Sequence, residues 1–548
     1  MKSFIQTTIL LLGMLLPATA SAIINLGYDF EVDGIYYDYG EVQGTVEVTL
    51  PPDTIKYCGD VVIPATVTHG GRTYTVIAIG SYAFDESLDL TSVIIPNSVT
   101  AIRNHAFWGC KGLRSVSIGN SVSSIGGQAF YACEKLTSVS LPNSLTRIDF
   151  CAFESCTGLT SMTIPSSVQF IGSDVFIDCT GLESLVVDSD NPIYDSRNHC
   201  NAIIFSPSST LIAGCKNTVI PDGVTAIGYG AFSCCTGLKS INIPNSVTYI
   251  GEWAFNSCKS LEALVIPSSV TTIGRGAFAN CAGLAYITVD DGNTTYDSRN
   301  HCNAIIETAT GSLIAGSNNT VIPNSVSTIE DYAFSERSGL TSMNLPNGLT
   351  RIGMYAFAYS SLTSVNIPEG VTFIPEGAFL KCSNLTRVSI PSNVTWFGTY
   401  AFAYCFGLTN MVIPATVTAI GQGAFAHCSG VTDVYSYITD FSELWMGDDV
   451  FEHFENYAWR TLHVPHGMAA VYQADWNWYP HFWQIVEGLL PGDLDADARI
   501  SIADVSVLID MLLGGNVPDA PDADIDHDGN ITISDATSLI DMLLTGAW

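Results

Sequence analysis

A 23-residue repeat runs through most of this chain and constrains its fold more than any other feature. The phrase Ile/Leu-Pro-x-x-Val-Thr-x-Ile-Gly-x-x-Ala-Phe-x-x-Cys-x-x-Leu-x-x-Val returns 23 residues later, as from Pro142 to Pro165 and from Pro221 to Pro244. The repeat phenylalanines keep the same register: Phe84, Phe107, Phe130, Phe153, Phe176, Phe232, Phe255, Phe278, Phe334, Phe357, Phe379, Phe402 and Phe425. One unit cannot bury its apolar face alone, whereas stacked units share a core, so the repeat predicts a solenoid.

Each unit contains one stretch with the period of a β-strand. Residues 136–141 are apolar at the first, fourth and sixth positions, and Pro142 ends the stretch. A second apolar set then turns the chain back: Leu145, Ile148, Ala152 and Phe153. We therefore expect strands of successive coils to pair in parallel, about 4.8 Å apart. Small uncharged side chains should face solvent from these strands: Ser138, Ser140, Ser161, Thr163, Ser240, Asn242, Ser342 and Asn344.

Two inserts interrupt the period. They lie at about 188–219 and 290–321, and both contain the sequence Tyr-Asp-Ser-Arg-Asn-His-Cys-Asn-Ala-Ile-Ile, 102 residues apart. This identity indicates a duplicated block, which we expect to form a β-hairpin extension projecting from one edge of the solenoid. A ligand loop presented twice and a duplicated structural element are both compatible with it.

The cysteines follow the repeat rather than a disulfide pattern. Ten of the 16 lie three residues after a repeat Phe: Cys110, Cys133, Cys156, Cys179, Cys235, Cys258, Cys281, Cys382, Cys405 and Cys428. Ser87, Arg337 and Ser360 take this place in other units, which an obligatory pairing scheme would not tolerate. We predict a ladder of buried free thiols, and the absence of any Cys-x-x-Cys pair argues against a zinc site.

Charge and targeting signals limit the partners. The net charge of −33 opposes binding to nucleic acid, which depends on Lys and Arg. Residues 1–22 combine Lys2, an apolar run and small-residue cleavage patterns, as an export signal does. No later run is long enough for a membrane span. The expected location is outside the cell, secreted or on the cell surface.

The last 61 residues contain 12 Asp and one basic residue, Arg499. Two acidic segments repeat at an offset of 31 and place oxygen donors at loop positions 1, 3, 5, 7, 9 and 12, the pattern that calcium prefers. The predicted ligands are Asp493, Asp495, Asp497, Arg499, Ser501 and Asp504 in the first loop, and Asp524, Asp526, Asp528, Asn530, Thr532 and Asp535 in the second. Arg499 and Asn530 would contribute backbone carbonyls. The alternative is a solvated acidic tail.

Each loop runs into a predicted helix. The apolar residues at helical spacing are Val505, Leu508, Ile509 and Leu512 after the first loop, and Ala536, Leu539, Ile540 and Leu543 after the second. A complete EF-hand needs a helix entering the loop as well, but Pro491, Pro518 and Pro521 disfavour one.

The repeat resembles the BspA-like leucine-rich repeats of bacterial surface proteins. The marks are the Leu-x-x-Leu-x-Leu spacing, the Pro after the strand and the Ala-Phe-x-x-Cys phrase. The resemblance implies a mainly β solenoid over 77–487, preceded by an N-terminal β cap over 23–76. Its closing unit would contain Tyr472, Trp478, Phe482 and Ile485.

The duplicated half EF-hands of 488–548 resemble type I dockerins, small all-α calcium-binding modules that attach proteins to cohesin domains. This resemblance implies two Ca²⁺ ions and a cohesin-domain partner. It assigns partner contacts to loop positions 10 and 11, which are Ile502, Ala503, Ile533 and Ser534. Position 6 requires a positive φ, which costs about 1–2 kcal/mol for the Ala498 found in the first loop, so the first site should be weaker.

No segment large enough for a catalytic domain remains, so we do not expect an enzyme. The histidines of the closing unit, such as His453 and His481, are spaced irregularly and are better explained by packing than by a metal. The predicted function is that of an exported adhesion protein, whose solenoid binds an extracellular protein or a neutral glycan and whose dockerin attaches it to a cohesin. The alternative is a non-catalytic subunit of a polysaccharide-degrading assembly similar to a cellulosome.

Overall fold

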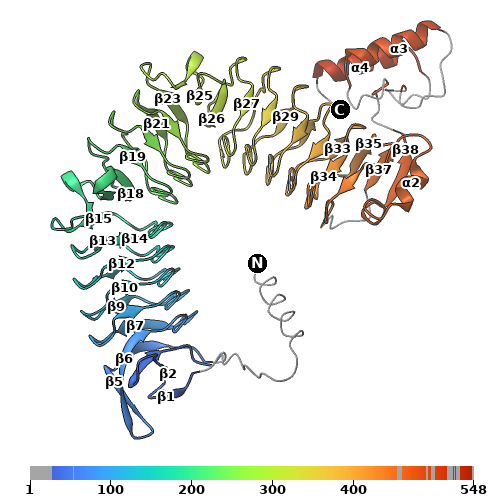
Figure 1. The fold of residues 1–548 in the computed structure, drawn as a ribbon. Helices are drawn as coiled ribbons and strands as arrows, with labels where there is room; N and C mark the ends of the chain where they lie inside the picture. Colours follow the sequence, from blue (N-terminus) through green and yellow to red (C-terminus); the bar gives the residue numbers. More distant parts are fainter. Residues whose placement is uncertain are drawn as a thin grey trace.

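The computed structural model describes residues 28–52, 55–452, 460–488, 492–494, 500–514, 523, 525 and 531–545. These residues form a curved rod of stacked coils, with a group of strands at its N-terminal end and helices at its C-terminal end (Figure 1). The export signal predicted for residues 1–22 lies outside the described residues. Among those described, no helix has the length and hydropathy to cross a membrane.

The N-terminal strands close the first end of the core. Their bounds are β1 (Phe30–Val32), β2 (Ile35–Tyr39), β3 (Thr45–Val48), β4 (Gly59–Val62), β5 (Thr66–His69) and β6 (Arg72–Ile79). β1, β2 and β3 are antiparallel, and β3 then pairs in parallel with β6. β6 continues in parallel into the next coil, so these strands extend the solenoid sheet instead of forming a separate domain.

Most regular coils contribute to two parallel ladders. In most coils the predicted strand is present, with a register of 23 residues, as for Ser138 opposite Ser115. These strands are β7 (Leu90–Ile94), β9 (Ser115–Ser117), β11 (Ser138–Val139), β13 (Ser161–Ile164), β15 (Ser184–Val187), β21 (Ala263–Ile266), β23 (Tyr286–Val289), β29 (Ser364–Asn366), β31 (Arg387–Ser389), β33 (Asn410–Ile413) and β35 (Asp433–Ser436). Alternate side chains point inward, and all eight small polar residues predicted to face solvent are exposed.

A second ladder of two-residue strands precedes the Gly corner. It consists of β8 (Ala101–Ile102), β10 (Ser124–Ile125), β12 (Arg147–Ile148), β14 (Phe170–Ile171), β19 (Ala226–Ile227), β20 (Tyr249–Ile250), β22 (Thr272–Ile273), β27 (Thr328–Ile329), β28 (Arg351–Ile352), β30 (Phe373–Ile374), β32 (Trp396–Phe397), β34 (Ala419–Ile420) and β36 (Trp445–Met446). Gly has a packing role at this corner, because a Cβ on Gly172 would lie 2.5 Å from the backbone nitrogen of Phe150 in the preceding coil.

Phenylalanines and cysteines fill the core in register. Phe107 and Phe130 stack with their ring centroids 5.1 Å apart, and this stack continues through each regular segment. The Cys133 thiol donates to the Phe107 carbonyl at 3.3 Å, and eight other ladder thiols donate to the equivalent Phe in the same way. All 16 cysteines lie among the described residues and none forms a disulfide there. Nine ladder cysteines are buried and Cys235 is half-buried.

Each insert forms a septum, by which we mean a hairpin that crosses the core and divides it into separate segments. The first contains β16 (Tyr194–Asp195), β17 (Ala202–Phe205), β18 (Thr210–Gly214) and 3-10 turns at Arg197–His199 and Ser206–Ser208, and the second contains β24 (Tyr296–Asp297), β25 (Ala304–Glu307), β26 (Ser312–Gly316) and a turn at Arg299–His301. β17 and β18 form the expected antiparallel hairpin, but it does not project from the solenoid. Opposite faces of β17 are both buried, so Ile203 joins the core before the insert and Ile204 joins the core after it. The rod bends near β18 (Figure 1).

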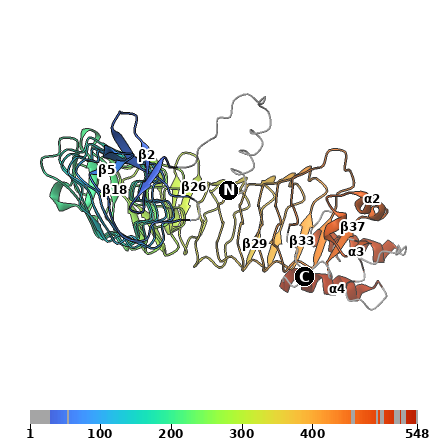
Figure 2. The same ribbon diagram turned by 90° about the horizontal axis from the view of Figure 1, so that it is seen from below.

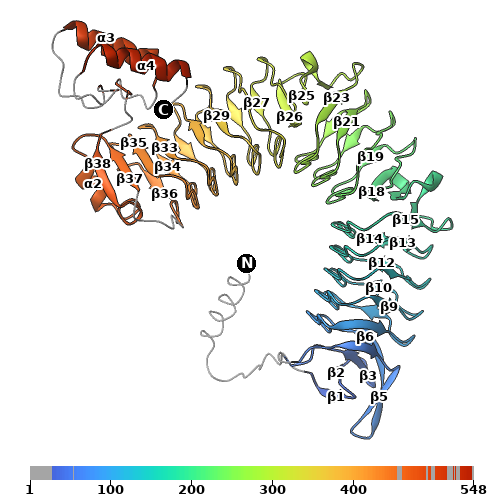
Figure 3. The ribbon, with the colours of Figure 1, turned by 180° about the vertical axis from the view of Figure 1, so that it is seen from behind.

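The C-terminal end closes with β37 (Thr461–Val464), α2 (Ala469–Ala474), a 3-10 turn at Tyr479–His481 and β38 (Gln484–Glu487). Tyr472 and Trp478 are fully buried against the last coils, as the closing unit predicts. Helices α3 (Ile502–Gly514) and α4 (Ile533–Thr545) follow and lie beside this end of the rod (Figures 2 and 3). They pack on each other, with Leu508 and Leu539 fully buried between them.

Candidate calcium loops and binding surfaces

In each of the two tail loops, a buried carboxylate at an equivalent position accepts hydrogen bonds from the loop backbone. Asp504 is fully buried, and its Oδ1 and Oδ2 accept hydrogen bonds at 2.7 Å from the backbone N–H groups of Leu494 and Ser501. Asp535 is also fully buried and accepts the equivalent bonds at 2.7 Å from Ile525 and Thr532. The 31-residue sequence repeat is therefore also a repeat of geometry.

Five of the predicted calcium ligands lie in the described part of the chain: Asp493, Ser501, Asp504, Thr532 and Asp535. The other seven lie outside it: Asp495, Asp497, Arg499, Asp524, Asp526, Asp528 and Asn530. The described residues alone contain no group of three or more His, Cys, Asp or Glu able to hold a metal. Asp493 is buried and accepts a hydrogen bond from the Tyr437 hydroxyl, so the first loop contacts the end of the solenoid.

The two helices expose matching apolar stripes. All four predicted partner-contact residues, Ile502, Ala503, Ile533 and Ser534, are exposed. Ile502 and Ile533 are 73% and 79% exposed. The stripes continue to Leu513 and Leu544, which are 81% and 78% exposed and were not predicted. Ile509 and Ile540, which belong to the apolar residues predicted at helical spacing, also lie at the surface. The helices contact each other along a narrower face, centred on Leu508 and Leu539.

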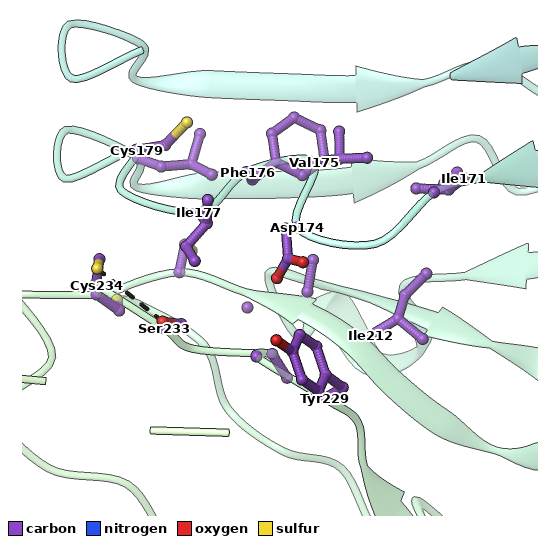
Figure 4. Close-up of a pocket in the computed structure, with 18 residues that line it drawn as sticks. Ile171, Asp174, Val175, Phe176, Ile177, Cys179, Ile212, Tyr229, Ser233 and Cys234 are labelled. Carbon is purple, nitrogen blue, oxygen red and sulfur yellow. Dashed lines mark hydrogen bonds between the residues drawn. The ribbon is translucent and has the colours of Figure 1, made fainter. Parts of the chain in front are cut away.

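The first insert leaves a small cavity in the core. The cavity has a volume of about 30 Å³ and is lined on one side by Asp174 and Cys179 and on the other by Tyr229 and Cys234 (Figure 4). Cys235 also lines it. The cavity has room for only one or two water molecules. Cys235 has no repeat Phe carbonyl within reach, because the insert separates its coil from the preceding one. The cavity is a packing defect and not a ligand site.

At the second insert, a charged residue makes the contact with the preceding coil that is missing at the first insert. Arg337 takes the place of Cys235 and is fully buried. Its guanidinium donates to the carbonyls of Gly316 and Phe278 at 2.8 Å, Ser335 at 3.1 Å and Cys281 at 3.2 Å. Phe278 is the repeat Phe that precedes the insert, so Arg337 spans the gap that a thiol cannot. Burial lowers the pKa of Arg337.

The closing-unit histidines lie in separate environments. His463 Nε2 lies 2.8 Å from Asp433 Oδ1, and its ring stacks on Tyr435. Burial lowers the pKa of His481, which favours its neutral form. Among the described residues these histidines form no metal site, and His453 lies outside that part of the chain.

Comparisons with known proteins match the repeat. Six copies of the BspA type leucine rich repeat region align with residues 77–201, 212–312 and 315–432, well over half of the chain. No curated protein matches the chain.

Several solved structures are similar in sequence. A leucine-rich repeat protein from Bacteroides ovatus is 26% identical, with 84% of this chain and 100% of that one covered, at a TM-score of 0.37. A leucine rich cell surface protein from Faecalibacterium prausnitzii is 24% identical, with 86% and 98% covered, at a TM-score of 0.38. The pneumococcal vaccine antigen PcpA is 16% identical, with 84% and 98% covered, at a TM-score of 0.33. TM-scores this low do not establish a shared overall shape, so the family assignment depends on the repeats.

Proposed function

Because the chain belongs to the BspA-type leucine-rich repeat family, we propose that it is an exported, non-catalytic binding protein. The observation that carries this proposal is the series of exposed hydroxyl and amide side chains on the strands of several coils, such as Ser138, Thr163 and Asn366. Hydroxyl and amide groups of this kind offer hydrogen bonds but no activated nucleophile. Solenoids use such extended surfaces to bind large ligands.

The inserts have a smaller role in ligand binding than their duplication implies. Most of their apolar residues are buried in the septa. The exposed residues lie in short turns, such as Asn198 and His199 or Asn300 and His301, and at Val219 and Val321. The structural explanation of the duplication is therefore favoured, and the ligand surface is assigned to the coils.

The tail is proposed to be a calcium-dependent docking module. Its donor set consists of carboxylate, hydroxyl and carbonyl oxygens, which suits a hard divalent cation. Asp504 and Asp535 are buried and accept hydrogen bonds from the backbone N–H groups of Leu494 and Ile525. Calcium, when bound, would supply the positive charge that opposes repulsion among the 12 aspartates of 488–548. Its ligands would be the residues at the six loop positions of each repeat.

The matching stripes on α3 and α4 support a docking role. Isolated exposed apolar residues are common on protein surfaces, but here Ile502 and Leu513 recur at the same offset as Ile533 and Leu544. Either helix therefore offers a similar surface to a partner. We propose a cohesin module as that partner, and the solenoid as the part that it tethers.

The test uses purified cohesin modules of type I and the full chain, with calcium and with excess chelator. We expect binding only with calcium, and its loss when Ile502→Asp and Ile533→Asp are combined. Val219→Asp is the matched control, because Val219 is 69% exposed on the solenoid. No binding to any module, or binding unchanged by the double variant, would refute the docking proposal. A bound cohesin encoded beside glycoside hydrolases would favour the polysaccharide-degrading assembly.

A further inference from the structure

A groove of about 450 Å³ runs along the edge of the first five coils. Its aromatic wall is formed by Trp108 and Tyr131, whose rings stack 5.5 Å apart. Glu86 lies at one end and Asp178 at the other, four coils further on. At about 4.8 Å per coil, the groove is roughly 20 Å long.

The groove lies where three successive coils have a small residue at one repeat position. Two residues after the repeat Phe, the chain contains Gly109, Ala132 and Ser155, all lining the groove. The flanking coils have Glu86 and Asp178 there. Among the later coils, Cys234 and Ser257 are also small at this position, whereas the others have larger residues: Asn280, Glu336, Tyr359, Lys381, Tyr404 and His427. Every one of these residues has a positive φ, so the backbone conformation at this position is the same and a larger side chain is accommodated there in several coils.

The lining is polar but has little capacity for an anion. Lys111, the basic residue in the lining, forms an ion pair with Glu134 at 2.7 Å. Glu86 and Asp178 add two carboxylates, and Ser155 donates to Asp178 at 3.1 Å. Burial, with nearby carboxylates, raises the pKa of Tyr131, which keeps its hydroxyl protonated as a donor. The groove therefore offers carboxylate acceptors, hydroxyl groups and aromatic surface to a ligand.

The backbone at the floor of the groove is already paired. The N–H groups of Glu86, Gly109, Ala132 and Ser155 each donate to a carbonyl of the next coil, at 2.8–2.9 Å. An extended peptide therefore cannot add as a strand here, because peptide addition depends on unpaired main-chain groups. A neutral chain rich in hydroxyl groups has no such requirement, since carboxylates and hydroxyls accept and donate to it directly.

We propose that this groove binds a neutral oligosaccharide lying along the solenoid axis. The proposal rests on the proposed binding function and names the ligand class and its site. Aromatic side chains provide apolar contact area for the C–H faces of the sugar rings, while the carboxylates accept hydrogen bonds from the hydroxyls. An anionic polysaccharide or nucleic acid would be repelled by the same carboxylates.

The test fills the groove without changing the backbone. Ala132→Tyr places a tyrosine where Tyr359 and Tyr404 already occur at the same positive φ in other coils. Ser257→Tyr is the matched control, because Ser257 takes the same repeat position with φ 57 outside the groove. The full chain and both variants are applied to an array of neutral β-glucan, xylan, mannan and N-acetyllactosamine oligosaccharides. Thermal melting establishes that both variants are folded.

We expect the wild type to bind at least one of these oligosaccharides. Ala132→Tyr should weaken this binding by at least about tenfold, and Ser257→Tyr should not change it. Equal binding by all three proteins would place the glycan elsewhere and overturn the groove proposal, while the general binding function would stand. No binding to any neutral oligosaccharide would overturn the groove proposal as well. Binding of a basic peptide, abolished by moderate salt, would reassign the groove to a cationic ligand.

Discussion

Removing the Arg337 side chain should loosen the rod at the second insert. Its guanidinium donates four hydrogen bonds to backbone carbonyls of buried residues. Leaving one buried carbonyl unpaired costs about 1–3 kcal/mol. Removing a buried charge offsets several kcal/mol of this loss, because the charge no longer has to be desolvated. For Arg337→Met we expect a net local loss of about 3 kcal/mol, or roughly a hundredfold in the opening equilibrium.

Native-state hydrogen exchange measures this loss where it occurs. The amides of Gly316 and Phe334, which pair with the next coil at 2.9 and 2.7 Å, should lose protection. Amides of the first coils should keep their protection, because a solenoid is stabilised mainly by contacts between neighbouring units. Cys235→Ala is the control at the equivalent position, beside a cavity that already exists. Unchanged protection in Arg337→Met, or equal losses in both variants, would refute the bridging role of Arg337.

Three further outcomes are expected. In native protein the exposed Cys58 should react with a thiol reagent at once and the buried ladder thiols only on unfolding; mass spectrometry showing disulfides between neighbouring coils would contradict this. Burial raises the pKa of Cys156 from 9.0 to about 12. The stability that its neutral thiol contributes is therefore complete below pH 9.0 and is lost as pH rises toward 12. Alkaline denaturation followed by circular dichroism should begin in this window, and a stability unchanged across it would be inconsistent with buried thiols. Residues 488–548 should gain helix only with calcium, and Asp524→Ala should reduce this gain more than Asp493→Ala, because the first loop is already strained; equal helix content with chelator would argue against a calcium fold.

The repeat predicted the architecture because its signals are local and recur many times. A structural role inferred in one unit applied to the equivalent positions of the other coils. This held for the Pro that ends the strand, such as Pro142, for the Phe stack and for the Cys positions. The second ladder, of strands such as β12, was missed because two residues are too few to show a period. The apolar Ile203 and Ile204 indicated burial, but only the structure shows that they serve two different core segments.

The candidate sites were predicted less completely, for physical reasons. Loop positions predicted Ile502 and Ile533 as exposed, but exposure of Leu513 depends on how α3 and α4 pack, which the helical period does not determine. Arg337 looked like a tolerated exception at a Cys position, since two of its acceptors, the carbonyls of Cys281 and Phe278, lie in a coil distant in sequence. The groove depends on small residues such as Gly109, and a small residue is informative only once its repeat position is known to lie at the edge.

The central claim is that the solenoid binds ligand independently of the tail that docks it. The most direct test measures retention of the full chain on surfaces carrying a bound neutral oligosaccharide or a cohesin module, with calcium and then with excess chelator. We predict that chelator releases the chain from cohesin and leaves its retention on the oligosaccharide unchanged, at low and at moderate salt. Loss of both interactions with chelator, or retention on neither surface, would contradict the claim.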